Sequence, residues 1–489
     1  MNADAPPPTS PRARRAARAA SRKTARSRSR TGTSRRRRSA GSEAAAPRGR
    51  RRRGVPGSRR APAPPLLEDL EERGRALSWR RAPAPPTIRP AAAARRLHIL
   101  MVGWEFPPNH TGGLGVHSFE LCREIAQMGH RVTFLTPFPG PFTPVPGVTH
   151  RWPGGPRPEP EEAAEPIGEE RLLDAYEHPL DPSRPHLEAM TDYNGWIAAL
   201  SGTESVDLIH VHDWFGTVGA AALARRLHRP LVMTVHSTEY DRSLGHPWTE
   251  IVRREQAGLD AADAVIAVSR HLKEQLIARY HVPEGKIRVI YNAVRPSDRT
   301  DRLPTRAPVV LYLGRLAAMK GVDTFLRAGA RVLQRIPEVL LVVAGEGPEY
   351  PRLLILAAHL GIADHVLFLG KVSEEERTAL LARTAVFVLP SVVEPFGIAA
   401  LEAMAAGVPT IVSKTSGIVE VAEAVFAVDF WDIDEFASRI AELLQYPVLH
   451  DTMGEHGRED ALREGWAERA LETVGLYARL IRGGAGAAP

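Results

Sequence analysis

The chain has 489 residues, of which 43% are hydrophobic and 25% are charged, an ordinary balance for a folded protein of two or three domains. This composition excludes a fibrous or wholly disordered protein. No apolar run reaches the length of about 18 residues that predicts a membrane-spanning helix, so we expect no stable membrane insertion. The single cysteine, Cys122, excludes a disulfide framework and favours a reducing, cytoplasmic location.

The net charge of +7 combines two parts of opposite sign. Residues 1–60 contain 20 lysines and arginines but only Asp4 and Glu43, a net charge of +18, so the other 429 residues carry a net charge of −11. The basic isoelectric point therefore belongs to the N-terminal segment. It gives no argument that the remaining chain binds nucleic acid.

Residues 1–95 consist mainly of Arg, Ala, Ser and Pro. Such a segment cannot bury enough apolar surface to offset its conformational entropy, so a disordered basic tail is predicted. Its arginine runs at 35–38 and 50–53 are compatible with weak, salt-sensitive contact with a polyanion, with a transit peptide, or with a solvated extension.

From residue 97 onward, short apolar runs alternate with amphipathic stretches, a pattern typical of parallel sheets covered by helices. Strands are predicted at 98–102, 131–136, 208–211, 231–235 and 264–268, and again at 309–313, 340–344, 366–369, 386–389 and 410–412. Helices are predicted after a glycine-rich turn at 112–115, and at 323–335, 398–406 and 466–481. The fold class is therefore α/β, with two doubly wound Rossmann-like domains.

Pro-rich and polar stretches divide this pattern. Residues 137–185 predict a surface insertion, and residues 295–307 predict a linker. We thus expect a tail at 1–95, a first domain at 96–294, a linker at 295–307, a second domain at 308–465, and a C-terminal helix and tail at 466–489, which can pack on either domain. Ligands of such sheets bind beyond the carboxyl ends of the strands, here in a cleft between the domains.

Two segments suit phosphate groups. Gly112, Gly113 and Gly115 lie at a helix start, where free amides attract anions, although a tight turn alone also needs glycine. Gly314 is followed by Arg315 and Lys320, two cations five residues apart that suit a diphosphate. The alternative is a pair of solvated surface charges.

Two carboxylates, Glu394 and Glu402, are eight residues apart at another predicted helix start. Eight residues of helix rise about 12 Å, so this pair cannot act as acid and base on one bond. They can instead hold distant hydroxyls of one elongated ligand, while the amides of Gly397 and Ile398 face a phosphate. Alternatively, Glu394 only complements the helix dipole and Glu402 is an exposed residue.

Histidines end two of the predicted strands. His210 and His212 share one strand face and precede Asp213, but a zinc site needs further ligands that the sequence does not identify, so no metal is predicted. His236 ends the strand at 231–235 on the expected cleft side. The alternative is a structural histidine with satisfied hydrogen bonds.

Together these residues resemble the retaining glycosyltransferases of family 4, which have the GT-B fold, and among them the bacterial glycogen/starch synthase-like members. The resemblance covers residues 97–482 and rests on Glu394 and Glu402 as the family's E-x7-E signature. The other matching segments are 104–108, 112–115, 210–214, 234–236, 314–315, 320–321 and 344–347.

The resemblance implies a role for each site residue. Arg315 and Lys320 would clamp the donor diphosphate, with the segment of Gly113 and Gly115 closing over it. Glu394 would hold the hydroxyls of the donor sugar. Glu402 would hold the nucleotide ribose, and the amides of Gly397 and Ile398 would face the sugar and the phosphate. His236 would lie beside the sugar near the anomeric carbon, with Asp213 lining the same pocket.

The implied activity is the transfer of a hexose, glucose being the expected one, from a nucleotide-diphosphate sugar to a glycan acceptor. The configuration is retained by front-face attack, and neither a metal nor another cofactor is expected. One position departs from the synthases that use ADP-glucose: His110 stands where they carry a lysine of the donor site. The alternatives are a family-4 transferase of other specificity, mannosyl or glucosyl to lipid or capsule, and a non-catalytic nucleotide-sugar-binding protein.

Overall fold

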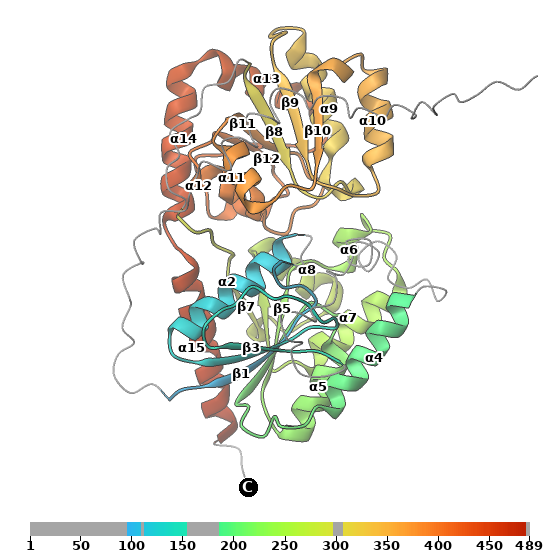
Figure 1. Ribbon diagram of the computed structural model, residues 1–489, viewed down its shortest axis with the longest axis vertical. Helices are drawn as coiled ribbons and strands as arrows, with labels where there is room; N and C mark the ends of the chain where they lie inside the picture. Colours follow the sequence, from blue (N-terminus) through green and yellow to red (C-terminus); the bar gives the residue numbers. More distant parts are fainter. Residues whose placement is uncertain (1–94, 109–111, 154–184, 297–306, 486–489) are drawn as a thin grey trace, which may run out of the picture. The chain divides into compact units, whose positions relative to one another are not determined.

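The computed structural model describes residues 95–108, 112–153, 185–296 and 307–485 (Figure 1). The predicted tail, most of the predicted linker and the larger part of the predicted insertion lie outside the described residues. Both sheets belong to one compact unit of the described residues. None of the described helices combines the length and the apolar character needed to cross a membrane.

The first sheet has seven parallel strands in the order β3-β2-β1-β4-β5-β6-β7. The strands are β1 (His98–Val102), β2 (Arg131–Leu135), β3 (Val148–Arg151), β4 (Leu208–His212), β5 (Leu231–Val235), β6 (Ala264–Ala267) and β7 (Ile287–Val289). The strand order changes direction between β1 and β4. This doubly wound arrangement is the one that the alternating sequence pattern predicts.

Successive side chains of β1 enter two separate hydrophobic clusters, because side chains of a strand alternate between the two faces of a sheet. Leu100 and Val102 pack with residues of α4, α5 and α7, whereas Ile99 and Met101 pack with residues of α2 and α15. Figure 1 shows these two groups of helices on either side of the first sheet. The helices of this domain are α2 (Gly113–Gln127), α4 (Pro185–Ala199), α5 (Thr217–Leu227), α6 (Glu239–Arg242), α7 (Thr249–Ala261), α8 (Arg270–Tyr280) and the 3-10 turn η1 (Glu284–Lys286).

The C-terminal helix α15 (Trp466–Ala485) packs on the first domain, a choice that the sequence left open. Leu476 and Tyr477 are buried beside α2 in the cluster under the first sheet. The Tyr477 hydroxyl also lies 2.6 Å from Nδ1 of His210 on β4. Helix α15 is therefore part of the core of the N-terminal domain.

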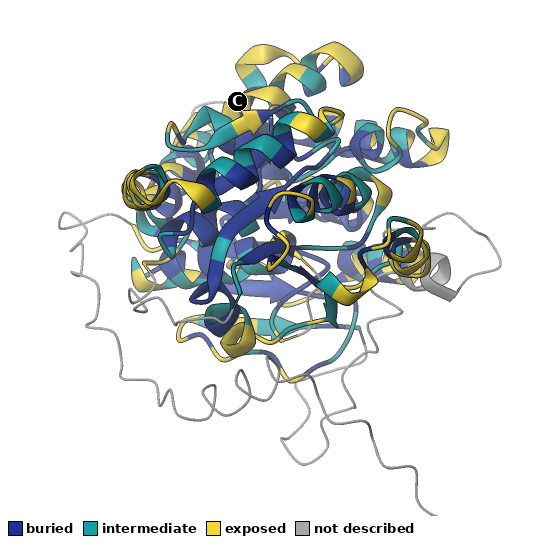
Figure 2. Cartoon of the chain, turned by 90° about the horizontal axis from the view of Figure 1, so that it is seen from above, coloured by how far each residue is buried: buried dark blue, intermediate teal, exposed yellow. Residues whose placement is uncertain are grey.

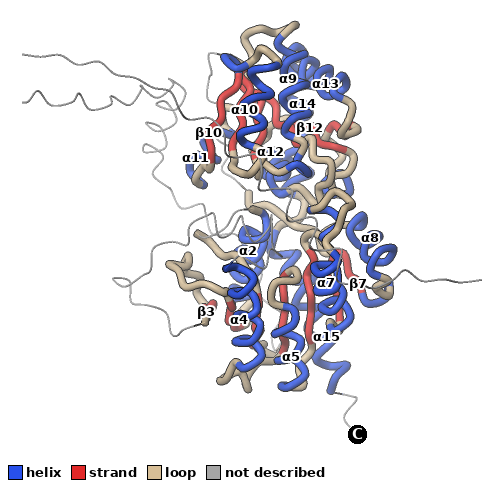
Figure 3. Tube along the Cα trace, turned by 90° about the vertical axis from the view of Figure 1, so that its right-hand side faces the viewer, coloured by secondary structure: helices blue, strands red, loops and turns tan. Residues whose placement is uncertain are grey.

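The second sheet has six parallel strands in the order β10-β9-β8-β11-β12-β13, with helices on both sides (Figure 3). The strands are β8 (Val309–Leu313), β9 (Leu340–Ala344), β10 (Val366–Gly370), β11 (Thr384–Leu389), β12 (Thr410–Ser413) and β13 (Phe426–Val428). The helices are α9 (Val322–Leu333), α10 (Tyr350–His359), α11 (Glu374–Leu381), α12 (Ile398–Ala405), α13 (Ile433–Gln445) and α14 (Pro447–Leu462), with 3-10 turns η2 (Ala318–Lys320), η3 (Ala363–His365) and η4 (Gly417–Glu420).

The central strands β4 and β8 are buried along their whole length, whereas the edge strands β3 and β10 are not. Figure 2 shows the buried residues gathered at the centre of the molecule and the exposed ones on its outer helices and loops. Helices on both faces of a parallel sheet explain the continuous apolar runs by which the central strands were predicted. Three short strands, β3, β7 and β13, were missed. The stretch 137–185, predicted as a surface insertion, contains one regular element, because β3 pairs with β2 at the sheet edge.

Candidate functional site

A cavity of about 360 Å³ lies where carboxyl ends of strands from both sheets meet, and its volume is within the range of small-ligand sites. Its walls come from segments that follow β1, β4, β5, β6 and β7 in the first sheet and β8, β9, β10 and β11 in the second. Eleven of the thirteen residues predicted for the site line it: Gly112, Gly113, Asp213, His236, Gly314, Arg315, Lys320, Glu394, Gly397, Ile398 and Glu402.

The other two predicted residues are not in the cavity wall. Gly115 does not line the cavity, because the glycine run that was predicted as a turn forms the first turn of α2. His110 lies outside the described residues. Its expected contact with the donor phosphate therefore stays a prediction.

Lys320 and Glu394 form an ion pair in the cavity wall. Lys320 Nζ lies 2.8 Å from Oε2 of Glu394, and the Ser391 hydroxyl donates to the same oxygen at 3.1 Å. Gly321, with φ +64°, makes this approach possible, since a Cβ there would lie 2.1 Å from the carbonyl oxygen of Pro390. The glycine after Lys320 thus brings the start of α9 against the segment that follows β11.

Arg315 follows the end of β8 and lines the same cavity as Lys320. The Tyr312 hydroxyl donates to the carbonyl oxygen of Arg315 at 2.8 Å, which fixes the backbone of this turn. Gly345 allows the neighbouring turn after β9 to pack closely, because a Cβ there would lie 1.9 Å from the carbonyl oxygen of Gly314. Two cations from one loop therefore face a single ligand-sized space.

Glu402 is paired with a cation that the sequence analysis missed. Its Oε1 lies 3.1 Å from Nη1 of Arg377 on α11, and the Glu402 side chain is 13% exposed. Burial raises the pKa of Glu402 above its usual range, and Arg377 opposes this shift. Glu394 precedes α12 and Glu402 lies within it, so each carboxylate has its own cation and its own part of the cavity.

The N-termini of α2 and α12 approach each other at the cavity. A Cβ on Gly113 would lie 3.1 Å from Cδ1 of Ile398, so glycine permits this close contact. Gly397 precedes α12 with φ +110°, a conformation that favours glycine. Both helix starts thus offer backbone amides to an anion in the cavity.

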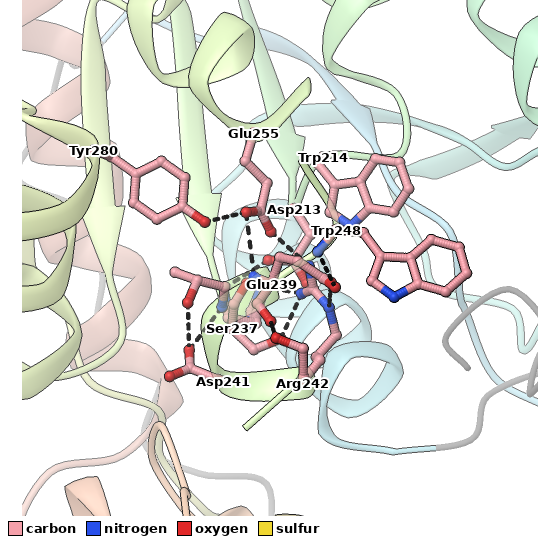
Figure 4. A network of polar contacts seen from close by, with 12 residues as sticks. Asp213, Trp214, Ser237, Glu239, Asp241, Arg242, Trp248, Glu255 and Tyr280 are labelled. Carbon is pink, nitrogen blue, oxygen red and sulfur yellow. Dashed lines mark hydrogen bonds and ion pairs between the residues drawn. The ribbon is translucent and has the colours of Figure 1, made fainter. Parts of the chain in front are cut away.

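Asp213 holds the segment that presents His236 (Figure 4). Its Oδ1 accepts a hydrogen bond from the backbone N–H of His236 at 2.7 Å. Burial raises the pKa of Asp213 to about 7, although the positive charge of Arg242 and the hydrogen bond from His236 oppose this shift. Asp213 therefore positions the histidine through its backbone.

Arg242 supports the same segment from α6 (Figure 4). Its guanidinium donates to the carbonyl and the hydroxyl oxygens of Ser237, both at 3.0 Å. It also pairs with Glu255 at 2.5 Å and with Glu239 at 3.3 Å. Sequence reasoning missed this network, because its members are scattered over α6, α7 and the loops after β4 and β5.

His236 lies against two buried histidines, His117 and His212. Its Nε2 lies 3.3 Å from Nδ1 of His212, and its ring centroid is 4.4 Å from that of His117 on α2. Burial lowers the pKa of His117 to about 4 and the pKa values of His212 and His236 well below the usual value of 6.5. These imidazoles are therefore neutral at neutral pH.

His210 lies beside His212 on the same face of β4, as the sequence predicts, with ring centroids 4.4 Å apart, but it is not a member of this group. Both of its ring nitrogens form hydrogen bonds, Nδ1 with Tyr477 at 2.6 Å and Nε2 with Thr234 at 2.7 Å. His210 is thus a structural histidine.

Comparison with known proteins gives consistent matches along the chain. Residues 111–298 match the family model described as Glycosyltransferase Family 4, and residues 295–460 match that of Glycosyl transferases group 1. The chain is 30% identical over 408 residues to an uncharacterized glycosyltransferase of Methanocaldococcus jannaschii, covering 78% of this chain and 98% of that protein. It is 28% identical over 414 residues to the glycogen synthase of Mycobacterium tuberculosis, covering 79% and 96%.

Solved structures show the same fold. Sucrose-phosphate synthase from Thermosynechococcus elongatus superposes with a TM-score of 0.64 at 24% identity, over 79% of this chain and 100% of that one. HepE of Anabaena, crystallised with UDP-glucose, superposes with a TM-score of 0.61 at 19% identity, again over 79% and 100%.

Proposed function

Since the chain belongs to glycosyltransferase family 4, and is thus a glycosyltransferase with the GT-B fold, we propose that it transfers a hexose from a nucleotide-diphosphate sugar with retention of configuration and without a metal ion. The observation that supports this most is the convergence of two cations, Arg315 and Lys320, and two carboxylates, Glu394 and Glu402, in one cavity. The cations can bind the diphosphate of such a donor, and the carboxylates can accept hydrogen bonds from its hydroxyls.

Glucose is the proposed sugar, and a glycan is the proposed acceptor. The support for glucose is the UDP-glucose bound to HepE, which has the same fold. The support for a glycan acceptor is the similarity to glycogen synthase over 96% of that protein. The nucleotide is left to experiment.

In the proposed mechanism, Arg315 and Lys320 stabilise the negative charge that develops on the diphosphate as its bond to the anomeric carbon breaks. Glu394 accepts hydrogen bonds from sugar hydroxyls and Glu402 from the ribose. The acceptor oxygen attacks the same face of the anomeric carbon, beside His236. Its proton passes to the oxygen of the departing phosphate.

A donor screen tests the proposal. The full chain is melted with UDP-, ADP- and GDP-sugars, and the donor that raises the melting temperature most is used with oligosaccharide acceptors in a transfer assay. We expect turnover to survive excess chelator, because Arg315 and Lys320 supply the positive charge that Mg²⁺ provides in other phosphate sites. Loss of activity on chelation that Mg²⁺ or Mn²⁺ restores would contradict metal independence.

The pair of Glu402 and Arg377 gives a second expected result. Glu402→Gln should weaken binding of the nucleotide diphosphate about tenfold or more, because a hydrogen bond to a charged acceptor is lost. Arg377→Ala should weaken binding less, and the double variant should resemble Glu402→Gln alone, because Arg377 acts through the carboxylate. Titration calorimetry measures all three variants.

The matched control is Arg352→Ala, which removes a cation from an exposed pair with Glu349 in the same domain. This change should leave nucleotide affinity unaltered. Strictly additive losses in the Arg377 and Glu402 variants would show that Arg377 does not act through Glu402.

A further inference from the structure

Three imidazoles of the N-terminal domain point at one small space. One ring nitrogen from each of His117, His212 and His236 lies within 4.8 Å of the other two. The residues come from α2, the end of β4 and the position after β5. His117 is 5% exposed and His212 is 1% exposed, so the group lies under the surface of the cavity that His236 lines.

Two nitrogens of this group lack a hydrogen-bond partner among the described residues. They are Nε2 of His117 and Nε2 of His212, and both are buried. Buried polar atoms in proteins nearly always have a partner. Two such atoms in one three-histidine group therefore point to a ligand that both can bind.

The contacts of His117 leave its free nitrogen with a lone pair. Its Nδ1 lies 2.7 Å from Oδ1 of Asn292, and an amide oxygen only accepts hydrogen bonds, so Nδ1 carries the proton. Nε2 is then unprotonated. A metal-binding histidine has the same arrangement, with one nitrogen donating to a protein oxygen and the other facing the ion.

We propose that His117, His212 and His236 bind a transition-metal ion of the Zn²⁺ class, and that the bound ion inhibits sugar transfer by withdrawing His236 from the cavity. Three histidines with a fourth position open are a common Zn²⁺ ligand set. At Zn–N distances near 2.0–2.1 Å, each nitrogen has to move inward by less than about 1 Å. His210 takes no part, because both of its nitrogens are engaged.

The third ligand explains why the sequence predicted no metal. His117 lies on α2, far from the strand of His212, and only the fold brings them together. The proposed ion is an inhibitor and not a cofactor, so it is compatible with turnover in excess chelator. The inhibition rests on the proposed transfer reaction, whereas the binding of the ion does not.

Cobalt tests the binding. The full chain without an affinity tag is treated with chelator, desalted and titrated with Co²⁺, whose visible absorption is intense when it has four ligands that include imidazoles. We expect absorption that saturates at one equivalent and disappears when Zn²⁺ is added. His117→Ala should lose this absorption, whereas His359→Ala, an exposed histidine of α10, should retain it.

His236→Ala is a second variant for the same titration, because His236 is the least buried of the three and its loss threatens the fold least. Circular dichroism shows whether each variant is folded. Absence of one-equivalent Co²⁺ absorption in the wild type would overturn the site. So would its persistence in folded His117→Ala and His236→Ala.

A transfer assay tests the inhibition. Zn²⁺ should abolish turnover of the wild type, chelator should restore it, and His117→Ala should keep its own metal-free rate when Zn²⁺ is added. Co²⁺ binding without Zn²⁺ inhibition would overturn the inhibitory role. If no donor supports transfer, the proposed function fails, and the cobalt titration still decides whether the ion binds.

Discussion

Replacing Lys320 by alanine is expected to lower the turnover number of sugar transfer about 10²- to 10³-fold, the usual cost of removing one group that stabilises a developing negative charge. Lys320 is only 21% exposed and lies in the wall of the cavity, where water screens its charge weakly. Arg315→Ala should have an effect of the same size, because the second cation of the loop faces the same space.

Steady-state kinetics at saturating acceptor distinguish this role from simple donor binding. A cation that acts mainly on the departing diphosphate affects kcat more than KM, whereas one that binds ground state and transition state equally affects KM alone. Lys414→Ala is the matched control, since Lys414 pairs with Asp429 in the same domain and its side chain is 58% exposed. Wild-type turnover in both Arg315→Ala and Lys320→Ala would favour a binding protein without catalysis.

The central strands could be predicted because a strand that is buried on both faces of its sheet must be mostly apolar. β4 and β8 are covered on both faces, so most of their residues are apolar, and the run is visible in the sequence. β3 and β13 lie at sheet edges and need only part of this burial. Their short, mixed sequences therefore carry no comparable signal.

The cavity residues could be predicted to converge because most of them directly follow strands. Asp213 follows β4, His236 follows β5 and Gly314 follows β8, and parallel strands of one sheet end at the same edge. The sequence also indicated the two cations Arg315 and Lys320 by their spacing. It gave no way to tell that Lys320 pairs with Glu394, 74 residues away.

Contacts between remote elements account for what the sequence could not predict. Arg377 on α11 forms an ion pair with Glu402 on α12, and Tyr477 on α15 forms a hydrogen bond with His210, 267 residues away. Such pairings depend on how helices lie on a sheet, which hydrophobic periodicity alone does not determine. The same limit hid His117, whose neighbours on α2 describe only an amphipathic helix.

Glu394→Gln is expected to lower kcat/KM for the donor about 10- to 100-fold, the cost of losing hydrogen bonds to a charged acceptor. The substitution keeps the shape of the side chain and its ability to accept from Ser391, which donates to Oε2 at 3.1 Å. Since Glu394 is 9% exposed and glutamine fits the same space, the melting temperature should change little. Glu435→Gln on α13 is the control, because Glu435 pairs with Arg439 at the surface.

The ion pair of Glu394 with Lys320 makes a stronger test possible. Without the donor, the Lys320 ammonium and the Glu394 carboxylate neutralise each other, with Nζ 2.8 Å from Oε2. A bound donor must therefore either displace this ion pair or bind to both of its members. If the two groups then hold adjoining parts of one ligand, the double variant Lys320→Ala with Glu394→Gln should be little worse than Lys320→Ala alone, because residues that act as a unit are not additive. Fully additive losses would mean that the two side chains contact the donor independently, and that their pairing in the empty cavity has no part in the reaction.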